Sequence, residues 1–290
     1  TILDKITLHA SELNITESSI NHVKAEVECE NDEKISLRYS DDVIQPGDNL
    51  LRFKYTGGAT RRAELGFSRL HISITTKKGE ILFDGTIMFI LVSDFQPTSA
   101  RKAFPCFDEP SFKAKYNIRL MTPDDSYNAI SNMPEIVSKG YIFPYKTSQE
   151  GDRSIPIRIY TYNASGETNG YAMNCTKRAL RFYSEYTEIS YPLSKLVFLH
   201  DRIFETRNYG YRKLGINHLQ GRAAQSNLNI YDEDQIEVVI YHELGHFWFG
   251  NLVTINDWWS DIWLQEGFAT YMSHKLYTKE HQRNRQVKEN

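Results

Sequence analysis

One five-residue motif, His242-Glu243-Leu244-Gly245-His246, constrains this chain more than any other feature of its sequence. On a helix, residues four apart share one face and lie a single turn from each other, so the two imidazoles can converge on one metal ion. Glu243 is rotated by one residue, which lets it reach a water on that metal without binding the metal itself. Zinc suits nitrogen ligands in tetrahedral geometry, and a catalytic zinc keeps one position open for water.

The spacing therefore predicts a metal centre that activates water. The pKa of a zinc-bound water falls to about 7, and a neighbouring carboxylate can then take its proton. A third protein ligand is still required. The alternative is a surface helix with two solvated histidines, although a chain of this composition is expected to match the motif by accident only roughly 0.02 times. The sequence around the motif favours the metal centre, because a second helix carrying Glu266 follows shortly afterwards.

Two helices are predicted to close the chain, and the motif lies on the first. Asp232 is placed to cap its first turn, and Gly250 suits its end. An apolar stripe with helical spacing runs between them: Ile236, Val239, Ile240, Leu244 and Phe247. The second helix is expected from about Trp258 to about Lys279. Its expected buried residues are Trp259, Ile262, Trp263, Phe268 and Leu276.

Most of the first half is predicted to be β-structure, and the pattern changes to helical spacing after residues 163–170. Short segments rich in β-branched and aromatic residues alternate with turn sequences, which indicates a largely antiparallel domain. The expected strands are 50–55, 70–75, 116–120 and 155–162. A helix over 171–186 and a strand over 195–199 are expected next. We therefore predict two domains, residues 1–164 and residues 165–290.

Composition excludes several classes of protein. The 290 residues carry a formal net charge of −3 without a basic block, so nucleic acid is excluded as a partner. The longest wholly apolar run, Ile87 to Val92, is far shorter than the roughly 18 residues of a membrane helix, so no transmembrane segment is expected. Three cysteines without CxxC spacing exclude a disulfide scaffold and a cysteine-rich zinc module.

A family resemblance extends over most of the chain. HELGHFWFGNLVT (242–254) and WWSDIWLQEGFATY (258–271) resemble the zinc aminopeptidases typified by aminopeptidase N, which are gluzincins. Residues 95–120, SNMP (131–134) and YPLSKL (191–196) are similar to the same family and follow in the same order. The resemblance implies an α+β fold, with an antiparallel β saddle or sandwich followed by a partial thermolysin-like catalytic domain. It also implies removal of N-terminal residues from peptide substrates.

The resemblance assigns roles to individual residues. It implies that His242, His246 and Glu266 bind one Zn²⁺ ion and that Glu243 is the general base. It also implies that Gln96, in FQPTSAR, and Asn208 contact the substrate. Many members of the family are membrane-anchored ectodomains, which implies a plasma-membrane or extracellular location, and cytosolic members supply the alternative.

The chain departs from the family pattern at several places. Phe247 to Gln265 is nineteen residues, one more than usual between the second histidine and the ligand glutamate, and we expect the extra residue in the loop before Trp258. Arg207 occupies the position of the glutamate that binds the substrate's amino group, where a guanidinium would repel an ammonium. Ser273 stands where an acidic residue usually orients a ligand histidine.

These departures keep a second function open. A catalytically impaired zinc-binding homologue would act as a peptide-binding module. The tyrosine that stabilises the oxyanion in the family is expected beyond Asn290, so the catalytic domain is expected to be C-terminally incomplete. Loss of such a donor typically lowers the rate by about 10²–10³.

Overall fold

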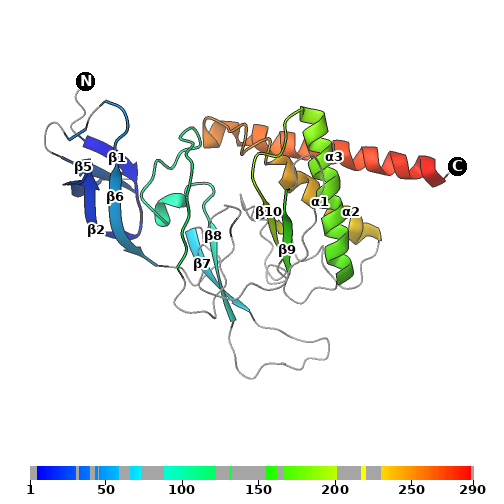
Figure 1. The fold of residues 1–290 in the computed structure, drawn as a ribbon, viewed down its shortest axis with the longest axis horizontal. Coiled ribbons are helices and arrows are strands. Elements are labelled where there is room, and N and C mark those ends of the chain that lie inside the picture. Colours follow the sequence, from blue (N-terminus) through cyan, green and yellow to red (C-terminus); the bar gives the residue numbers. More distant parts are fainter. Residues whose placement is uncertain are drawn as a thin grey trace. The chain divides into compact units, whose positions relative to one another are not determined.

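The computed structural model describes residues 5–30, 33–39, 43–44, 46–58, 66–72, 88–121, 131, 155–161, 166–200, 217–219 and 230–288 (Figure 1). Two compact units divide the chain, Thr1–Phe112 and Lys113–Asn290. The elements of the first are β1 (Lys5–His9), β2 (Leu13–Ile20), β3 (Val23–Lys24), β4 (Glu26–Glu30), β5 (Lys34–Arg38), β6 (Leu51–Gly57), β7 (Gly66–Ile72), β8 (Met88–Asp94) and the 3₁₀ turn η1 (Ala100–Lys102). Those of the second are β9 (Ile157–Thr161), α1 (Gly166–Thr187), β10 (Leu196–His200), β11 (Asn217–Leu219), α2 (Ile230–Gly245) and α3 (Trp258–Lys288).

The first unit is built from antiparallel strands. Two three-stranded sheets, in the orders β1-β5-β4 and β3-β2-β6, are accompanied by the pair β7-β8. Alternate residues of β5 and β2 point inward, and Leu37 and Ile20 are fully buried in one shared cluster. Because both sheets contribute to this cluster, they pack face to face as a sandwich. The expectation of an antiparallel β domain before a helical region, within an α+β fold, is confirmed.

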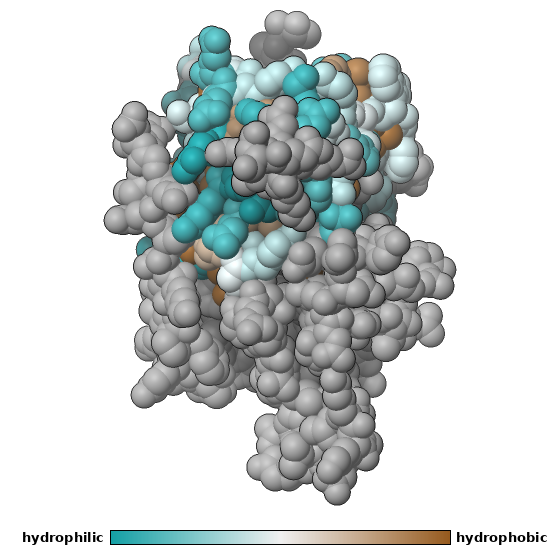
Figure 2. Space-filling view, turned by 90° about the vertical axis from the view of Figure 1, so that its right-hand side faces the viewer, coloured by the Kyte–Doolittle hydropathy of each residue, from teal (hydrophilic) through white to brown (hydrophobic). Residues whose placement is uncertain are grey.

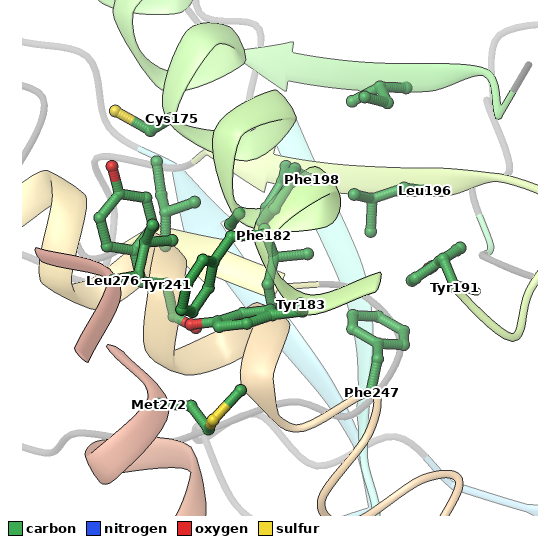
Figure 3. Close-up of a cluster of buried hydrophobic side chains, with 14 of the residues drawn as sticks. Cys175, Phe182, Tyr183, Tyr191, Leu196, Phe198, Tyr241, Phe247, Met272 and Leu276 are labelled. Atoms are coloured by element: carbon green, nitrogen blue, oxygen red, sulfur yellow. The ribbon is translucent and has the colours of Figure 1, made fainter. Parts of the chain in front are cut away.

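The second unit packs helices against a short parallel sheet with the strand order β11-β10-β9. Helix α1 buries Ala172, Cys175, Ala179 and Tyr183, which recur at helical spacing, against strand and helix residues. Figure 3 shows side chains from the sheet, from α1 and from the two closing helices meeting in one apolar cluster. The labelled members are Cys175, Phe182, Tyr183, Tyr191, Leu196, Phe198, Tyr241, Phe247, Met272 and Leu276.

Two strand predictions need correction. Residues 113–121 form no strand. The strand expected at 70–75 is described as far as Ile72, as the end of β7, and residues 73–75 lie outside the described residues. The strand expected at 155–162 is present as β9, but it pairs in parallel with β10 and lies in the second unit. Periodicity predicts that a segment is a strand, but it does not predict which strand lies beside it. Here β9 lies beside the buried strand β10. The boundary at 164/165 stays a prediction.

The closing helices also differ from expectation in detail. Helix α2 spans Ile230–Gly245, so Asp232 lies within the helix and not at the capping position before it. Helix α3 continues to Lys288, well past the expected end. Trp259 and Trp263 are 72% and 67% exposed, and Phe268 is exposed too, so these three are wrong as core residues. The buried face of α3 instead carries Gln265, Ala269, Met272 and Leu276.

No helix among the described residues combines the length and apolar character needed to cross a membrane. Figure 2 views the side of the molecule toward which α3 ends, and the coloured residues there are largely hydrophilic. Hydrophobic residues on this face form small separate patches. Scattered apolar residues of this kind are ordinary on a protein surface.

Candidate metal centre

Helix α2 buries one face in the core and carries the two motif histidines beside it. Ile236, Ile240 and Leu244 are almost fully buried in the core, and the two histidines lie on the adjacent face. The Tyr183 hydroxyl of α1 donates a hydrogen bond of 2.7 Å to the carbonyl oxygen of Tyr241, the residue before the motif. Burial raises the pKa of the Tyr183 phenol far above its ordinary value, so this donor keeps its proton at physiological pH. The helix is thereby fixed directly before its ligands.

A tightly bonded turn follows the motif. The backbone N–H groups of Asn251 and Leu252 donate to the carbonyl oxygens of His246 and Phe247, at 2.9 and 3.1 Å. Gly250 has φ +136°, a conformation that strongly favours glycine, and the side chain of Gln265 lies directly over it. Lys113 Nζ donates to the carbonyl oxygens of Asn251 and Leu252, both at 3.0 Å. Contacts from Gln265 and hydrogen bonds from Lys113 therefore both stabilise the turn.

Helix α3 begins after this turn and brings Glu266 to the motif. Asp257 caps the helix, because its Oδ1 accepts from the backbone N–H and the hydroxyl of Ser260, each at 2.9 Å. Helix α3 starts at Trp258, which agrees with the prediction that the extra residue lies in the loop before it. An extra residue within the helix would have rotated Glu266 by about 100°. The helices approach closely where Gly245 faces Ala269, and a Cβ at Gly245 would lie 3.3 Å from the Ala269 Cα atom.

Three polar atoms converge where the two helices meet. His242 Nε2 and His246 Nε2 are 3.0 Å apart. The Glu266 Oε2 atom lies 3.4 Å from His242 Nε2 and 3.5 Å from His246 Nε2. His246 is buried, and His242 and Glu266 are half-buried. These residues form the only group of three or more potential ligands with this geometry among the residues that the structure describes.

The group fits a zinc ion in donor chemistry and in size. Two imidazole nitrogens and one carboxylate oxygen are the His₂Glu set of catalytic zinc sites. Zinc–ligand bonds of about 2.0–2.1 Å in a tetrahedron place the ligand atoms about 3.3 Å from one another. The three separations of 3.0, 3.4 and 3.5 Å bracket that value. Two Nε2 lone pairs this close also repel each other unless a proton or a cation lies between them.

Each histidine has a different neighbour at its second nitrogen. His246 Nδ1 lies 3.2 Å from the Phe249 carbonyl oxygen, which belongs to the turn after α2. His242 Nδ1 lies 3.4 Å from the Thr270 hydroxyl oxygen, on α3. The Ser273 hydroxyl donates a hydrogen bond of 2.8 Å to the Thr270 carbonyl oxygen, and Ser273 is almost completely buried. No sequence motif pointed to Thr270, although its spacing of four residues from Glu266 places the two on one helix face.

The other predicted site residues do not belong to this cluster of three ligand atoms. Glu243 is half-buried on α2, beside His242. Gln96 is half-buried in a turn of the first unit, before η1. Asn208 and Arg207 lie outside the described residues. The structure therefore brings together the three predicted ligands, and the substrate-binding roles of Gln96 and Asn208 stay predictions.

Comparison with known protein families identifies the chain. A model described as the Peptidase family M1 domain matches residues 171–290, which include the whole metal centre. A second, described as the Peptidase M1 N-terminal domain, matches residues 2–145. The chain belongs to peptidase family M1. The resemblance to the aminopeptidases typified by aminopeptidase N is thereby confirmed, and the two M1 matches follow the order of the β-rich and helical regions.

Curated M1 relatives are similar along most of the chain. Aminopeptidase A of Gloydius brevicauda is 32% identical over 302 aligned residues, which cover 91% of this chain and 30% of the relative. Aminopeptidase M1-C of Oryza sativa subsp. japonica is 28% identical, with 93% of this chain and 32% of the relative covered. Human endoplasmic reticulum aminopeptidase 2 is 35% identical, over 65% of this chain and 22% of the relative. The chain thus spans less than a third of the length of these relatives.

Proposed function

We propose that this M1 chain is a zinc-dependent metallopeptidase that removes N-terminal residues from peptides. The convergence of two imidazole nitrogens and one carboxylate oxygen within 3.5 Å of one another carries the proposal. Family membership supports it, because the relatives are named as aminopeptidases.

The roles of the residues follow from their chemistry. His242, His246 and Glu266 would hold one Zn²⁺ ion. Zinc, when bound, supplies a Lewis acid that lowers the pKa of water and polarises a peptide carbonyl. Glu243, on the motif helix beside His242, accepts a proton at its carboxylate and returns it to the leaving amine. Gln96 and Asn208 are proposed to contact the substrate's N-terminal region.

A second candidate is a zinc-binding homologue that binds peptides without cleaving them. Arg207 favours it, because a guanidinium at the position of the family's amine-binding glutamate repels the ammonium group of a substrate. Under this proposal the metal centre stays intact and the exopeptidase step is lost.

One experiment separates the two candidates. The chain is purified without chelator, its zinc content is measured, and hydrolysis of an aminoacyl amide is assayed with and without chelator. The Glu243→Gln and Arg207→Glu variants are compared with the wild type. Wild-type turnover that chelator and Glu243→Gln both abolish supports the peptidase. Stoichiometric zinc without turnover, together with turnover gained on Arg207→Glu, supports the binding module. A chain purified without zinc contradicts both.

The cellular location of the protein is a separate proposal. An extracellular or ectodomain location is proposed from the family, with the cytosol as the alternative. Asn14-Ile15-Thr16 is a glycosylation sequon on β2, and both Asn14 and Thr16 are exposed. Treatment of the native protein with an N-glycosidase should therefore increase its electrophoretic mobility, and an unmodified Asn14 favours the cytosol.

A further inference from the structure

Helix α3 contacts both nitrogens of one ligand histidine. The Glu266 carboxylate lies 3.4 Å from His242 Nε2, and the Thr270 hydroxyl lies 3.4 Å from His242 Nδ1. Glu266 and Thr270 are four residues apart, so they lie on the same face of α3, about 6 Å apart along its axis. The imidazole of α2 therefore faces two successive turns of α3.

The Nδ1 atoms of the two histidines face different chemical groups. His246 Nδ1 faces a backbone carbonyl at 3.2 Å, and a carbonyl only accepts hydrogen bonds. The proton of His246 is thereby fixed on Nδ1, which leaves the Nε2 lone pair for the metal. His242 Nε2 points into the same cluster, 3.0 Å from His246 Nε2, and so its Nδ1 needs an acceptor for the same reason.

Ser273 stands where the family resemblance implies an orienting carboxylate. The residue is 1% exposed, and its hydroxyl donates a hydrogen bond of 2.8 Å to the backbone carbonyl oxygen of Thr270. The Thr270 hydroxyl oxygen lies 3.4 Å from His242 Nδ1. A hydroxyl oxygen carries two lone pairs and can accept the Nδ1 proton.

We propose that Thr270 is a positioning residue for His242, in place of the family's carboxylate. Its hydroxyl oxygen accepts a hydrogen bond from Nδ1–H and holds the ring with Nε2 toward the other two ligands. This inference rests on the proposed zinc site, and it assigns the orienting group to a neutral side chain four residues after Glu266. Loss of such an outer partner typically weakens metal binding 10–100-fold.

The test is the zinc affinity of three threonine variants, measured by competition with a chelator of known affinity. Thr270→Val keeps the β-branched shape and removes the hydroxyl, and it should weaken zinc binding at least tenfold. Thr270→Ser keeps the hydroxyl and should restore an affinity close to that of the wild type. Thr278→Val is the matched control, because Thr278 is exposed on the same helix two turns further on, and its affinity should be unchanged.

The outcomes distinguish this inference from the proposed function. Zinc binding by the wild type, with unchanged affinity in Thr270→Val, overturns the role of Thr270 and leaves the metal site standing. Equal weakening by Thr270→Val and Thr270→Ser also overturns it, because the hydroxyl is then not the deciding group. A wild-type chain that binds no zinc contradicts the proposed function itself. The unfolding midpoint of the zinc-free variants should match the wild type, and a large drop for Thr270→Val would assign its effect to folding.

Discussion

At the scale of single residues, Glu266 is the one charged side chain among the three residues proposed to bind zinc. It comes from a different helix than the two histidines, and its charge offsets that of a divalent cation. Glu266→Gln keeps the shape but removes the charge, so we expect zinc affinity to fall by more than the 10–100-fold typical of losing an outer partner. Chelator competition measures the change. Glu280→Gln, on the same helix but 3.8 Å from Arg178, is the control and should bind zinc like the wild type.

The cysteines give a second prediction at this scale, concerning reactivity. Burial raises the pKa of the Cys175 thiol to about 12, and burial also raises that of Cys106 to about 12. The thiolate is the reactive form, so at pH 8 its fraction is roughly a thousandfold lower than for an ordinary thiol of pKa about 8.5. Cys29 is exposed. We expect a thiol-specific reagent to modify one cysteine rapidly in the folded protein and all three after denaturation.

The Cys29→Ser variant is the control for this assignment. Its fast phase should disappear while the two slow thiols remain. Rapid modification of two or more thiols in the folded wild type would contradict the burial of Cys106 or Cys175.

At the scale of elements, the distance between α2 and α3 sets the geometry of the site. Gly245 permits this distance, because an added Cβ would lie 3.3 Å from the Ala269 Cα atom and 3.5 Å from its carbonyl oxygen. We expect Gly245→Ala to force the helices apart and to lower the free energy of unfolding by about 1–3 kcal/mol, as overpacking does. Since Glu266 moves with α3, zinc affinity should fall as well. Urea unfolding and chelator competition measure the two effects.

Gly267→Ala is the matched comparison on α3. A Cβ at Gly267 meets no atom within 4 Å, and the residue is exposed. Alanine should therefore only improve helix propensity and raise the free energy of unfolding by about 0.5–1 kcal/mol. If both alanine variants stabilise the protein equally, the close approach of α2 and α3 at Gly245 is refuted.

The buried face of α3 shows why element-scale expectations fail in part. Two faces of α3 carry apolar residues at helical spacing. One face has large aromatic residues and includes Trp259 and Trp263, and the other includes Ala269 and Met272. Hydrophobicity alone favours the aromatic stripe. The described structure buries the other one, because the small residues at 245 and 269 allow the backbones of α2 and α3 to approach.

At the scale of the whole molecule, the tryptophans report on one unit only. The chain has four, Trp248, Trp258, Trp259 and Trp263, and all lie in the unit Lys113–Asn290 with the metal centre. A ligand that binds only the folded state stabilises it by about 2.7 kcal/mol at a hundred times its Kd. Zinc should therefore raise the unfolding temperature recorded by tryptophan fluorescence, and chelator should reverse the shift.

The Glu266→Gln variant tests the specificity of this stabilisation. It should show little or no shift at the zinc concentration that stabilises the wild type. A shift of equal size in both proteins would place zinc elsewhere on the chain and contradict the assigned centre.

Local sequence patterns were enough to predict the three residues of the proposed metal centre and the order of most helices and strands. The spacing of His242 and His246 requires one helix face, and the strands 51–57 and 196–200 lie within two residues of the bounds that local periodicity predicts. The helix expected over 171–186 is present, but it begins earlier, at Gly166. Such signals are local, because a few neighbouring residues fix the spacing of side chains along a helix or strand.

Only the tertiary structure decided which elements meet. It paired β9 in parallel with β10, selected the buried face of α3, and placed Thr270 against His242. Nineteen residues separate His246 from Glu266, and their 3.5 Å contact depends on how closely α2 and α3 pack, which no local pattern specifies. Packing distances are set by the volumes of side chains that are remote in sequence, and these act only once the chain has folded.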